Sequence, residues 1–439
     1  MLFRPSRHIF RSRLLRLAIL IFLIWTFLEA FYIHRNLTAT NNSQPRRGNT
    51  EKVFIAGLPW NNEIILRTHL INQIRDVVHA LGAGNVFISI YENGSYDGTK
   101  DALRDLHREL EELGVRTRFV LDETSHQDIV KARPTSPQEG WIKIQQTGFE
   151  KFDVHKGDYA LRRIHYLAQL RNKALEPLFE LSEKGEKFDR VLFLNDVVFT
   201  ADDVLNLLQT RDGEYAAACS LDFESPPAFY DTFALRDSEG YPALMQTWPF
   251  FRSSASRNAA MTNQPIPIRS CWNGIVAMTA AAFYSPTYPL RFRGVPDTLA
   301  AHHMEGSECC LIHADNSFAP SLGTWINPNV RVGYCHADLH KPEKAKFRLE
   351  WDVFKGLCQM NYDAVHPSGG RSWVGMGRVA WGLWENRVRR WVTSGEVVSS
   401  KVAKGVKAWV EEAEGRREPG EMCLVDEMHV IEPHGWLHV

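Results

Sequence analysis

The chain has 439 residues, of which 44% are hydrophobic and 23% are charged, so it is long and apolar enough to fold around a sizeable core. The net charge is −1, but residues 1–50 carry eight arginines and one acid, which leaves the rest of the chain acidic. This acidic body argues against a nucleic-acid partner, because proteins that bind nucleic acids need a basic surface.

The N-terminus is basic and then strongly apolar. Five arginines between Arg4 and Arg16 precede the run LAILIFLIWTFLEAFYI at residues 17–33, which has the length of a short membrane span. The pattern predicts a cytoplasmic tail (1–16), a signal anchor (17–33), a polar stem (34–50) and a lumenal body, as in a single-pass type II protein of the Golgi or ER membrane. A cleaved signal peptide is the alternative, although no A-x-A site closely follows the run.

Asparagine sequons and cysteines are consistent with a lumenal body. Sequons begin at Asn36 and Asn41 in the stem and at Asn93 in the folded part. We expect Asn93 to be unmodified, because it lies in a candidate ligand loop. The seven cysteines show no CxxC spacing that would indicate a zinc site, and their odd number leaves at least one free or paired between chains.

Strand and helix patterns alternate from residue 51 onward. Strands are predicted at 53–56, 85–92, 115–122 and 191–199, and helices at about 70–81, 103–113, 159–181 and 204–209. Repeated β-α units predict an α/β fold with a mostly parallel central sheet and helices on both faces. Ligands bind beyond the carboxyl ends of the strands in such sheets, so the polar residues at those ends are the site candidates.

The segment VLFLNDVVF, residues 191–199, places Asn195 and Asp196 inside an otherwise apolar run. A carboxylate there is costly unless something pairs with it. Thr200 and Asp203 form the pattern of a capping box for the next helix, so Asp196 is not needed as its cap. Carboxylate oxygens suit Mn²⁺ or Mg²⁺ together with substrate phosphates, so Asp196 predicts a divalent-cation site.

The segment ENGSYDGT follows the second strand and carries acids at Glu92 and Asp97 around a glycine turn. Its acceptor groups are suited to a ribose and a base, but the same pattern also fits a simple β-α turn with capping residues.

Nine segments together resemble the fungal capsule-associated α-1,3-mannosyltransferase family, whose members are GT-A-like glycosyltransferases. They occur in order over residues 53–334, and they are FIAGLPWNNE, FISIYENGSYDGT, RRIHYLAQLRNKALEPL, RVLFLNDVVF, AAACSLDF, YDTFALRD, SCWNGIVAM, GSECCLIHAD and NPNVRVGY. The resemblance implies a GT-A-like catalytic domain over 51–340 that transfers mannose from GDP-mannose to a mannose-containing glycan, with retention of configuration. Capsule or cell-wall polysaccharide synthesis is the implied setting.

The resemblance also implies roles for the donor-side residues. Glu92 and Asp97 would contact the nucleotide base and ribose. Arg171 and Asn172 would approach the diphosphate, since an arginine fork suits phosphate, although a surface ion pair and a cap are the alternative. Because the departing diphosphate can take the acceptor's proton in a retaining enzyme, catalysis would depend chiefly on cations at the leaving group.

The metal motif departs from the D-x-D of the GT-A fold. Asn195 stands where the first acid belongs and Val197 where the second belongs, so Asp196 is the only acid. The implied Mn²⁺ or Mg²⁺ would therefore be shared with another segment, and His313 and Asp315 in LIHAD are candidates. A structural histidine is the alternative for His313.

Acceptor-side candidates follow later in the chain. Glu308 comes after Ser307, a predicted N-cap, and resembles the acid near the acceptor in GT-A enzymes. Trp272 offers a face for a sugar ring and Asn273 an amide for its hydroxyls, with a core position as the alternative.

Two other functions remain open at this point. The non-acidic Asn195 and Val197 fit a non-catalytic GT-A-like scaffold or glycan-binding protein in polysaccharide export. A lumenal hydrolase using Glu308 with Asp231 or Asp237 is the second rival. Six of the 13 tryptophans lie between Trp373 and Trp436, and residues 341–439 are predicted to be a C-terminal extension packed on the catalytic domain. A membrane-surface or acceptor-glycan platform is the alternative for this extension.

Overall fold

The computed structural model describes residues 13–39, 50–145, 147–152, 154–334, 348–367, 371–393, 395–432 and 435–439. Most of the predicted cytoplasmic tail, the Asn41 sequon and the predicted domain boundary at residue 340 lie outside the described residues.

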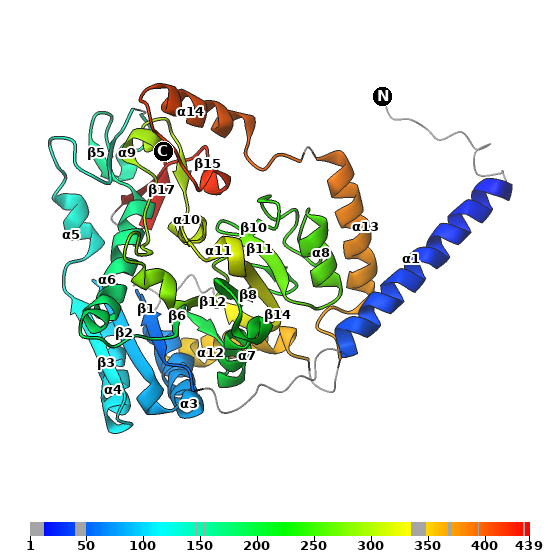
Figure 1. Ribbon diagram of the computed structural model, residues 1–439, viewed down its shortest axis with the longest axis horizontal. Coiled ribbons are helices and arrows are strands. Elements are labelled where there is room, and N and C mark those ends of the chain that lie inside the picture. The colour runs from blue at the N-terminus through cyan, green and yellow to red at the C-terminus, as the bar shows by residue number, and fades with distance from the viewer. Residues whose placement is uncertain are drawn as a thin grey trace.

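One large sheet with the order β10-β11-β14-β8-β12-β6-β1-β2-β3 forms the centre of the molecule (Figure 1). The pairings β3-β2-β1-β6 and β8-β14 are parallel, whereas β12 runs antiparallel between β6 and β8, and β11 runs antiparallel to β14. The predicted parallel core is therefore confirmed. The strands are β1 (Val53–Gly57), β2 (Val86–Asn93), β3 (Arg116–Asp122), β6 (Arg190–Leu194), β8 (Ala217–Ser225), β10 (Arg236–Asp237), β11 (Ile266–Ser270), β12 (Ile275–Thr279) and β14 (Thr324–Tyr334).

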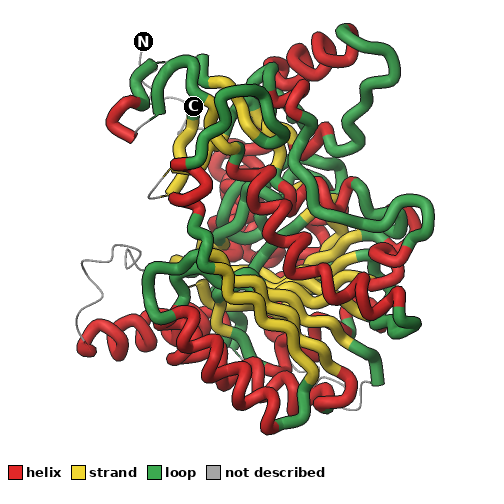
Figure 2. Tube along the Cα trace, turned by 90° about the vertical axis from the view of Figure 1, so that its left-hand side faces the viewer, coloured by secondary structure: helices red, strands yellow, loops and turns green. Residues whose placement is uncertain are grey.

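Both faces of the sheet are covered, as Figure 2 shows from the side. In β1, Phe54 and Ala56 belong to one hydrophobic core while Val53 and Ile55 belong to the other, because alternate side chains of a strand point to opposite faces. The second core contains side chains of α3 (Ile71–Leu81), α4 (Thr99–Glu112), α7 (Ala201–Leu208) and α12 (Arg348–Val365). The first core contains side chains of α6 (Arg163–Glu183), α10 (Glu308–Ala314), α13 (Met376–Val392) and α14 (Ser400–Glu411).

Shorter elements complete the fold. They are α2 (Glu63–Ile65), α5 (His126–Lys131), α8 (Ser254–Met261), α9 (Asp297–Ala300), α11 (Ala319–Leu322), β4 (Trp141–Lys143), β5 (Tyr159–Leu161), β7 (Val197–Val198), β9 (Ala228–Phe229), β13 (Glu305–Gly306), β15 (Leu424–Val425), β16 (His429–Glu432) and β17 (Gly435–His438).

Two predicted elements differ from the structure. The strand expected at 191–199 is divided, because the chain turns at Asn195 and Asp196 and β7 leaves β6 to pair with β14. The helix expected from residue 159 begins at Arg163, because residues 159–161 pair with β4 as β5. The intervening Arg162 is extended and fully buried, and its Nη2 lies 3.0 Å from Oε1 of Glu305.

The predicted capping box at the start of α7 is confirmed. The Thr200 hydroxyl accepts a hydrogen bond from the Asp203 amide at 3.2 Å, and the Asp203 carboxylate accepts one from the Thr200 amide at 2.8 Å. Asp196 therefore has no capping role at this helix.

The N-terminal helix α1 (Arg13–Ala39) is apolar and projects from the body beside α13 (Figure 1). Its segment Arg13–Thr38 is long enough to cross a membrane and has a mean hydropathy of 2.1. Only 6% of the residues in its most apolar stretch are buried against the rest of the protein. This helix is compatible with a single-pass membrane protein.

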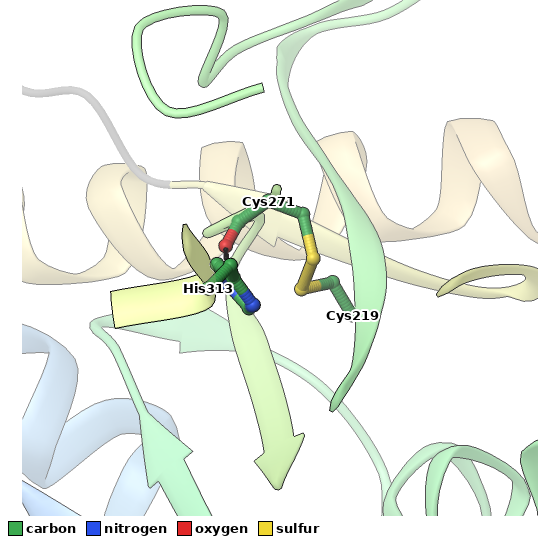
Figure 3. A group of neighbouring side chains, drawn as sticks. All are labelled: Cys219, Cys271 and His313. Atoms are coloured by element: carbon green, nitrogen blue, oxygen red, sulfur yellow. Dashed lines mark hydrogen bonds between the residues drawn. A yellow bond between two sulfur atoms is a disulfide. The ribbon is translucent and has the colours of Figure 1, made fainter. Parts of the chain in front are cut away.

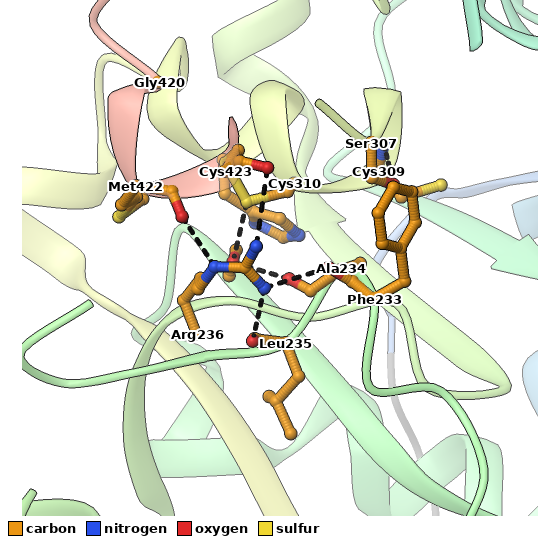
Figure 4. The surroundings of a disulfide bond; sticks show 12 residues. Phe233, Ala234, Leu235, Arg236, Ser307, Cys309, Cys310, Gly420, Met422 and Cys423 are labelled. Carbon is orange, nitrogen blue, oxygen red and sulfur yellow. Dashed lines mark hydrogen bonds between the residues drawn. A yellow bond between two sulfur atoms is a disulfide. The ribbon is translucent and has the colours of Figure 1, made fainter. Parts of the chain in front are cut away.

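The C-terminal residues are tied to the central sheet. A disulfide joins Cys310 of α10 to Cys423, and β15 pairs with β13. Beside the disulfide, Arg236 of β10 donates to the carbonyl oxygens of Met422 at 2.6 Å and Leu235 at 2.8 Å (Figure 4). These contacts hold residues 422–425, which lead into the hairpin β16–β17, against the rest of the fold.

Candidate functional site

Asp196 lies where three strands end. It follows β6, and its carboxylate accepts hydrogen bonds from the Asn62 side-chain amide at 3.1 Å and from the Tyr334 hydroxyl at 3.0 Å. Asn62 belongs to the loop after β1, and Tyr334 is the last residue of β14. The half-buried carboxylate is therefore placed at the carboxyl edge of the sheet, as predicted for a ligand site.

A second acid, Asp222 of β8, lies close to the Asn195–Asp196 turn. The carbonyl oxygen of Gly274 accepts a hydrogen bond from the Asn195 amide at 3.2 Å, and a Cβ added at Gly274 would lie 3.3 Å from the Cβ of Asp222. Gly274 has φ +76°, a conformation that favours glycine, and a larger residue there would collide with Val332. The bare backbone at Gly274 thus lets Asn195 and Asp222 approach from two sides.

Asp222 is only partly satisfied by hydrogen bonds. Oδ1 accepts from the Asn273 amide at 3.0 Å, whereas Oδ2 is buried without a hydrogen-bond partner in the described part of the chain. Burial, followed by repulsion from Asp231, raises the pKa of Asp222 to about 7. An orphaned carboxylate oxygen of this kind is chemically suited to a divalent cation.

Asp231 extends this acidic site. Burial raises the pKa of Asp231 to about 6, against the opposing effect of hydrogen bonds from the amides of Ala234 and Phe233, and Glu308 raises it further. Asp222 and Asp231 therefore form a buried acidic pair in which each charge disfavours the other, and Asp196 lies at the same edge of the sheet.

The arginine predicted to approach a donor is brought to this site. Nε of Arg171 donates to Oε1 of Glu308 at 3.0 Å, and its guanidinium carbon lies 4.6 Å from the centre of the Trp272 ring. The predicted N-cap is confirmed, because the Ser307 hydroxyl accepts from the Cys309 amide at 3.2 Å. Arg171 and Glu308 are thus fixed as a nearly buried ion pair.

Three other side chains that were predicted to contact a ligand, Trp272, Asn273 and Asn172, also contact their neighbours in the fold. Trp272 is 4% exposed and packs on Phe193 and Phe292, and Asn273 is fully buried while its amide holds Asp222. The amide of Asn172 exchanges two hydrogen bonds with the backbone of Phe292, at 2.8 and 3.0 Å. These contacts fix the three side chains within the fold, and a direct contact of any of them with donor or acceptor remains a prediction.

His313 lies beside a disulfide (Figure 3). Its Nε2 donates to the Cys271 carbonyl oxygen at 2.7 Å, and burial lowers its pKa to about 4. Cys219, Cys271 and His313 are close enough to hold a metal, but the two sulfurs are bonded to each other and are not free ligands. Asp315 pairs with Arg293 at 2.6 Å. In the described residues, no hydrogen bond or ion pair joins His313 or Asp315 to Asp196, so neither enters the cation site proposed below.

The acids of the loop 92–99 hold the loop itself. Glu92 is fully buried and accepts from the Ser95 amide at 2.6 Å. Asp97 accepts from the amides of Glu63 and Thr99, both at 3.0 Å. These contacts fix the loop against residues 61–63, and a direct contact of Glu92 or Asp97 with a nucleotide remains a prediction.

Asn93 is expected to carry no glycan. Its side chain is 6% exposed, its amide donates to the Thr124 carbonyl oxygen at 2.6 Å, and its oxygen accepts from the Tyr166 hydroxyl. A glycosylating enzyme needs that amide nitrogen free and exposed. Glycopeptide mapping of the active protein should find position 93 unoccupied. High occupancy there would remove the loop from any ligand site.

A cavity of about 250 Å³ opens beside the loops that follow β1 and β2. Its aromatic and polar lining includes Trp60, Asn93, Arg163, Tyr166 and Trp436. Trp436 comes from β17, and the Arg163 guanidinium carbon lies 4.6 Å from the centre of its ring. The hairpin near the C-terminus therefore supplies one wall of a pocket at the carboxyl edge of the sheet. A larger cavity of about 580 Å³ lies between residues 142–145, residues 300–304 and the C-terminal part of the chain, and the acid in its lining is Asp426, which pairs with Lys401.

Several residues of this site were not assigned to it from sequence. Asn62, Tyr334, Arg163 and Trp436 join it through contacts between distant segments. Asp222 carried a detectable signal, because it is an acid at the end of the apolar segment AAACSLDF.

Comparisons with known proteins give a consistent picture. A family model described as Cryptococcal mannosyltransferase 1 matches residues 52–315. The α-1,3-mannosyltransferase CMT1 of Cryptococcus neoformans var. neoformans serotype D is 27% identical over 314 residues, which cover 68% of this chain and 60% of that protein. The chain therefore spans about three fifths of that relative's length.

Solved glycosyltransferase structures are more distant. The mannosyltransferase PcManGT from Pyrobaculum calidifontis in complex with GDP-Man and Mn²⁺ is 10% identical, with coverage of 89% of this chain and 84% of that chain and a TM-score of 0.37. GalNAc-T7 with UDP, GalNAc and Mn²⁺ is 11% identical, with coverage of 77% and 55% and a TM-score of 0.38.

Proposed function

Because the chain belongs to the family of Cryptococcal mannosyltransferase 1, we propose that it transfers mannose from GDP-mannose to a mannose-containing glycan. The α-1,3 linkage and retention of configuration are part of this proposal, as is a place in capsule or cell-wall polysaccharide synthesis. The observation that supports this proposal best is the acidic site at the carboxyl edge of the sheet. The ion pair of Arg171 with Glu308 and an aromatic pocket lie beside it.

The pocket suits the base of the donor. Its volume of about 250 Å³ is small, so it fits one planar ring system better than an oligosaccharide. Trp60, Tyr166 and Trp436 offer ring faces for stacking, and Asn93 offers a polar edge. The pocket adjoins the ends of β1 and β2, where nucleotides bind in sheets of this kind.

The arginines suit the diphosphate. Among the described residues, the hydrogen bond that Arg171 donates to Glu308 uses Nε, which leaves its two terminal nitrogens available for phosphate oxygens. Glu308 and the Trp272 ring hold the guanidinium in place. Arg163 on the same helix adds positive charge between the pocket and the acids.

The acids fit a divalent cation such as Mn²⁺ or Mg²⁺. Asp196 and Asp222 would hold it, with the Asn195 amide beside them, and it would supply positive charge for the leaving diphosphate. Asn62 and Tyr334 orient the Asp196 carboxylate, and Asn273 orients that of Asp222. Glu308 stays a candidate for contact with the acceptor, because it lies beside Arg171.

The cellular setting belongs to the same proposal. Helix α1 would remain as a signal anchor in the Golgi or ER membrane, with a lumenal catalytic body. The disulfides Cys219–Cys271 and Cys310–Cys423 are expected of an oxidising compartment.

A donor screen tests the reaction and the pocket together. Of the GDP- and UDP-sugars, GDP-mannose with Mn²⁺ should be hydrolysed or used for transfer. Trp436→Ala should weaken GDP binding by about 10- to 100-fold, since stacking a base on an aromatic ring is worth about 1–3 kcal/mol. The control Trp391→Ala changes a tryptophan that is 87% exposed on α13 and should leave GDP affinity unchanged.

The rivals predict other results. A scaffold would bind GDP without turnover of any nucleotide sugar. A hydrolase using Glu308 would cleave glycans without nucleotide or metal. Equal loss of GDP binding in both tryptophan variants would move the base away from this pocket.

A further inference from the structure

Helix α13 carries a stripe of exposed tryptophans. Trp381, Trp384 and Trp391 are 62%, 47% and 87% exposed, and their spacing places them on one side of the helix. Val379 and Leu383, on the opposite side, are buried in the core. Large aromatic residues gathered on one exposed face indicate a surface with a partner.

The same helix contacts the membrane-type helix α1. Nη2 of Arg387 lies 2.6 Å from both carboxylate oxygens of Glu29. Ala30, Ile33 and Leu37 near the end of α1 are buried, whereas the earlier residues from Leu17 to Leu28 are mostly exposed. Figure 1 shows α1 leaving the body at α13. Because α13 packs against α1, the membrane that α1 is proposed to cross lies next to the tryptophan face.

Helix length sets the depth of this contact. The 26 residues of Arg13–Thr38 span about 39 Å at 1.5 Å per residue, against about 30 Å for the hydrocarbon core and about 40–45 Å with headgroups. The packed final turns of α1 would then lie at the headgroup level on the side of the folded body. Glu29 lies nine residues before Thr38, about 14 Å along α1, so its pair with Arg387 brings α13 at least as deep as the headgroups.

We propose that α13 lies in the interface of the membrane that α1 crosses, with Trp381, Trp384 and Trp391 among the lipid headgroups. The inference rests on the proposed retention of α1 as an anchor. Tryptophan is enriched at membrane interfaces, because its ring is apolar and its N–H remains polar. Arg378, exposed on α13, supplies positive charge for lipid phosphates, and the exposed Arg389 lies on the same helix in an ion pair with Glu385 at 2.7 Å. The contact holds the catalytic body against the membrane.

A label on α13 tests the contact in the full-length chain. Trp391→Cys is labelled with an environment-sensitive NBD group and reconstituted into phosphatidylcholine vesicles that contain phosphatidylserine. Emission should shift to the blue and be quenched by lipids with a nitroxide near the headgroup. The matched control is Glu111→Cys on α4, whose side chain is 66% exposed and which Figure 1 shows far from α13. Labelling of the parent chain gives the background.

The outcomes separate the proposals. Equal solvent exposure of the labels at positions 391 and 111, in protein that resists carbonate extraction, overturns the interfacial contact and leaves the anchor standing. Release by carbonate, or a mature N-terminus beyond residue 30, overturns both. Arg387→Ala should make the label at 391 more solvent-exposed while α1 stays in the bilayer. GDP-mannose turnover in the same vesicles reports on the proposed reaction independently.

Discussion

Asp196→Asn is expected to reduce mannosyl transfer from GDP-mannose by roughly 10²–10³, because one charged group at the leaving diphosphate is worth about 3–4 kcal/mol of the barrier. The fold should survive, since the asparagine keeps one acceptor oxygen and the change loses at most one of the hydrogen bonds from Asn62 and Tyr334, about 1 kcal/mol. Initial rates and thermal melting, with and without GDP and Mn²⁺, measure both effects. The variant should show no added stabilisation from Mn²⁺.

Asn195→Asp is the informative partner of that variant. It restores an acid at the first position of the D-x-D pattern, so Mn²⁺ affinity should be kept or increased if Asn195 faces the cation. No change in affinity would limit Asn195 to ordering the turn through its backbone bond to Gly274. Full activity of Asp196→Asn combined with a melting temperature lower by several degrees would make Asp196 structural and contradict the proposed cation site.

Asp222→Asn is expected to stabilise the protein above pH 7. Burial raises the pKa of this carboxyl to about 7, so between its unfolded pKa near 4 and pH 7 the native state holds a proton that the unfolded state has lost. Wild-type stability should therefore fall as pH rises through that window, by on the order of 4 kcal/mol, and stay level above it. The asparagine removes this dependence and keeps the acceptor for Asn273. Urea unfolding from pH 4 to 8, without metal, measures it.

Asp203→Asn is the matched control, because its effect on stability should be opposite to that of Asp222→Asn. Burial alone would raise the pKa of Asp203, but contacts with His366, Tyr362 and Thr200 lower it. Stability from this group is present above the unfolded pKa and is lost as pH falls, so the asparagine should destabilise the protein at pH 7 and much less in acid. If both variants shifted stability in the same direction at pH 8, the charge of Asp222 would not be the cause. Loss of transferase activity in Asp222→Asn alone would further support its place in the cation site.

Short sequence patterns were enough to predict much of the central sheet. The first three strands are found within one or two residues of their predicted bounds, because apolar runs that end at polar or glycine residues specify a strand over a few positions. The capping groups Thr200 and Ser307 were predictable for the same reason, since a cap is a contact over three residues. The position of Asp196 at a strand end also followed from its neighbours in the chain.

Long-range pairing decided the rest. The chain itself determined an α/β sheet, an acid at its carboxyl edge, an apolar N-terminal helix and an arginine on the helix before the key strand. Only the tertiary structure brought Asn62 and Tyr334 to Asp196, across 134 and 138 residues, and turned β7 away from β6. It also placed His313 beside a disulfide and Trp436 in the pocket wall. Such contacts depend on how strands from distant segments pair and on which side chains the core then buries, and no periodicity in a short window specifies either.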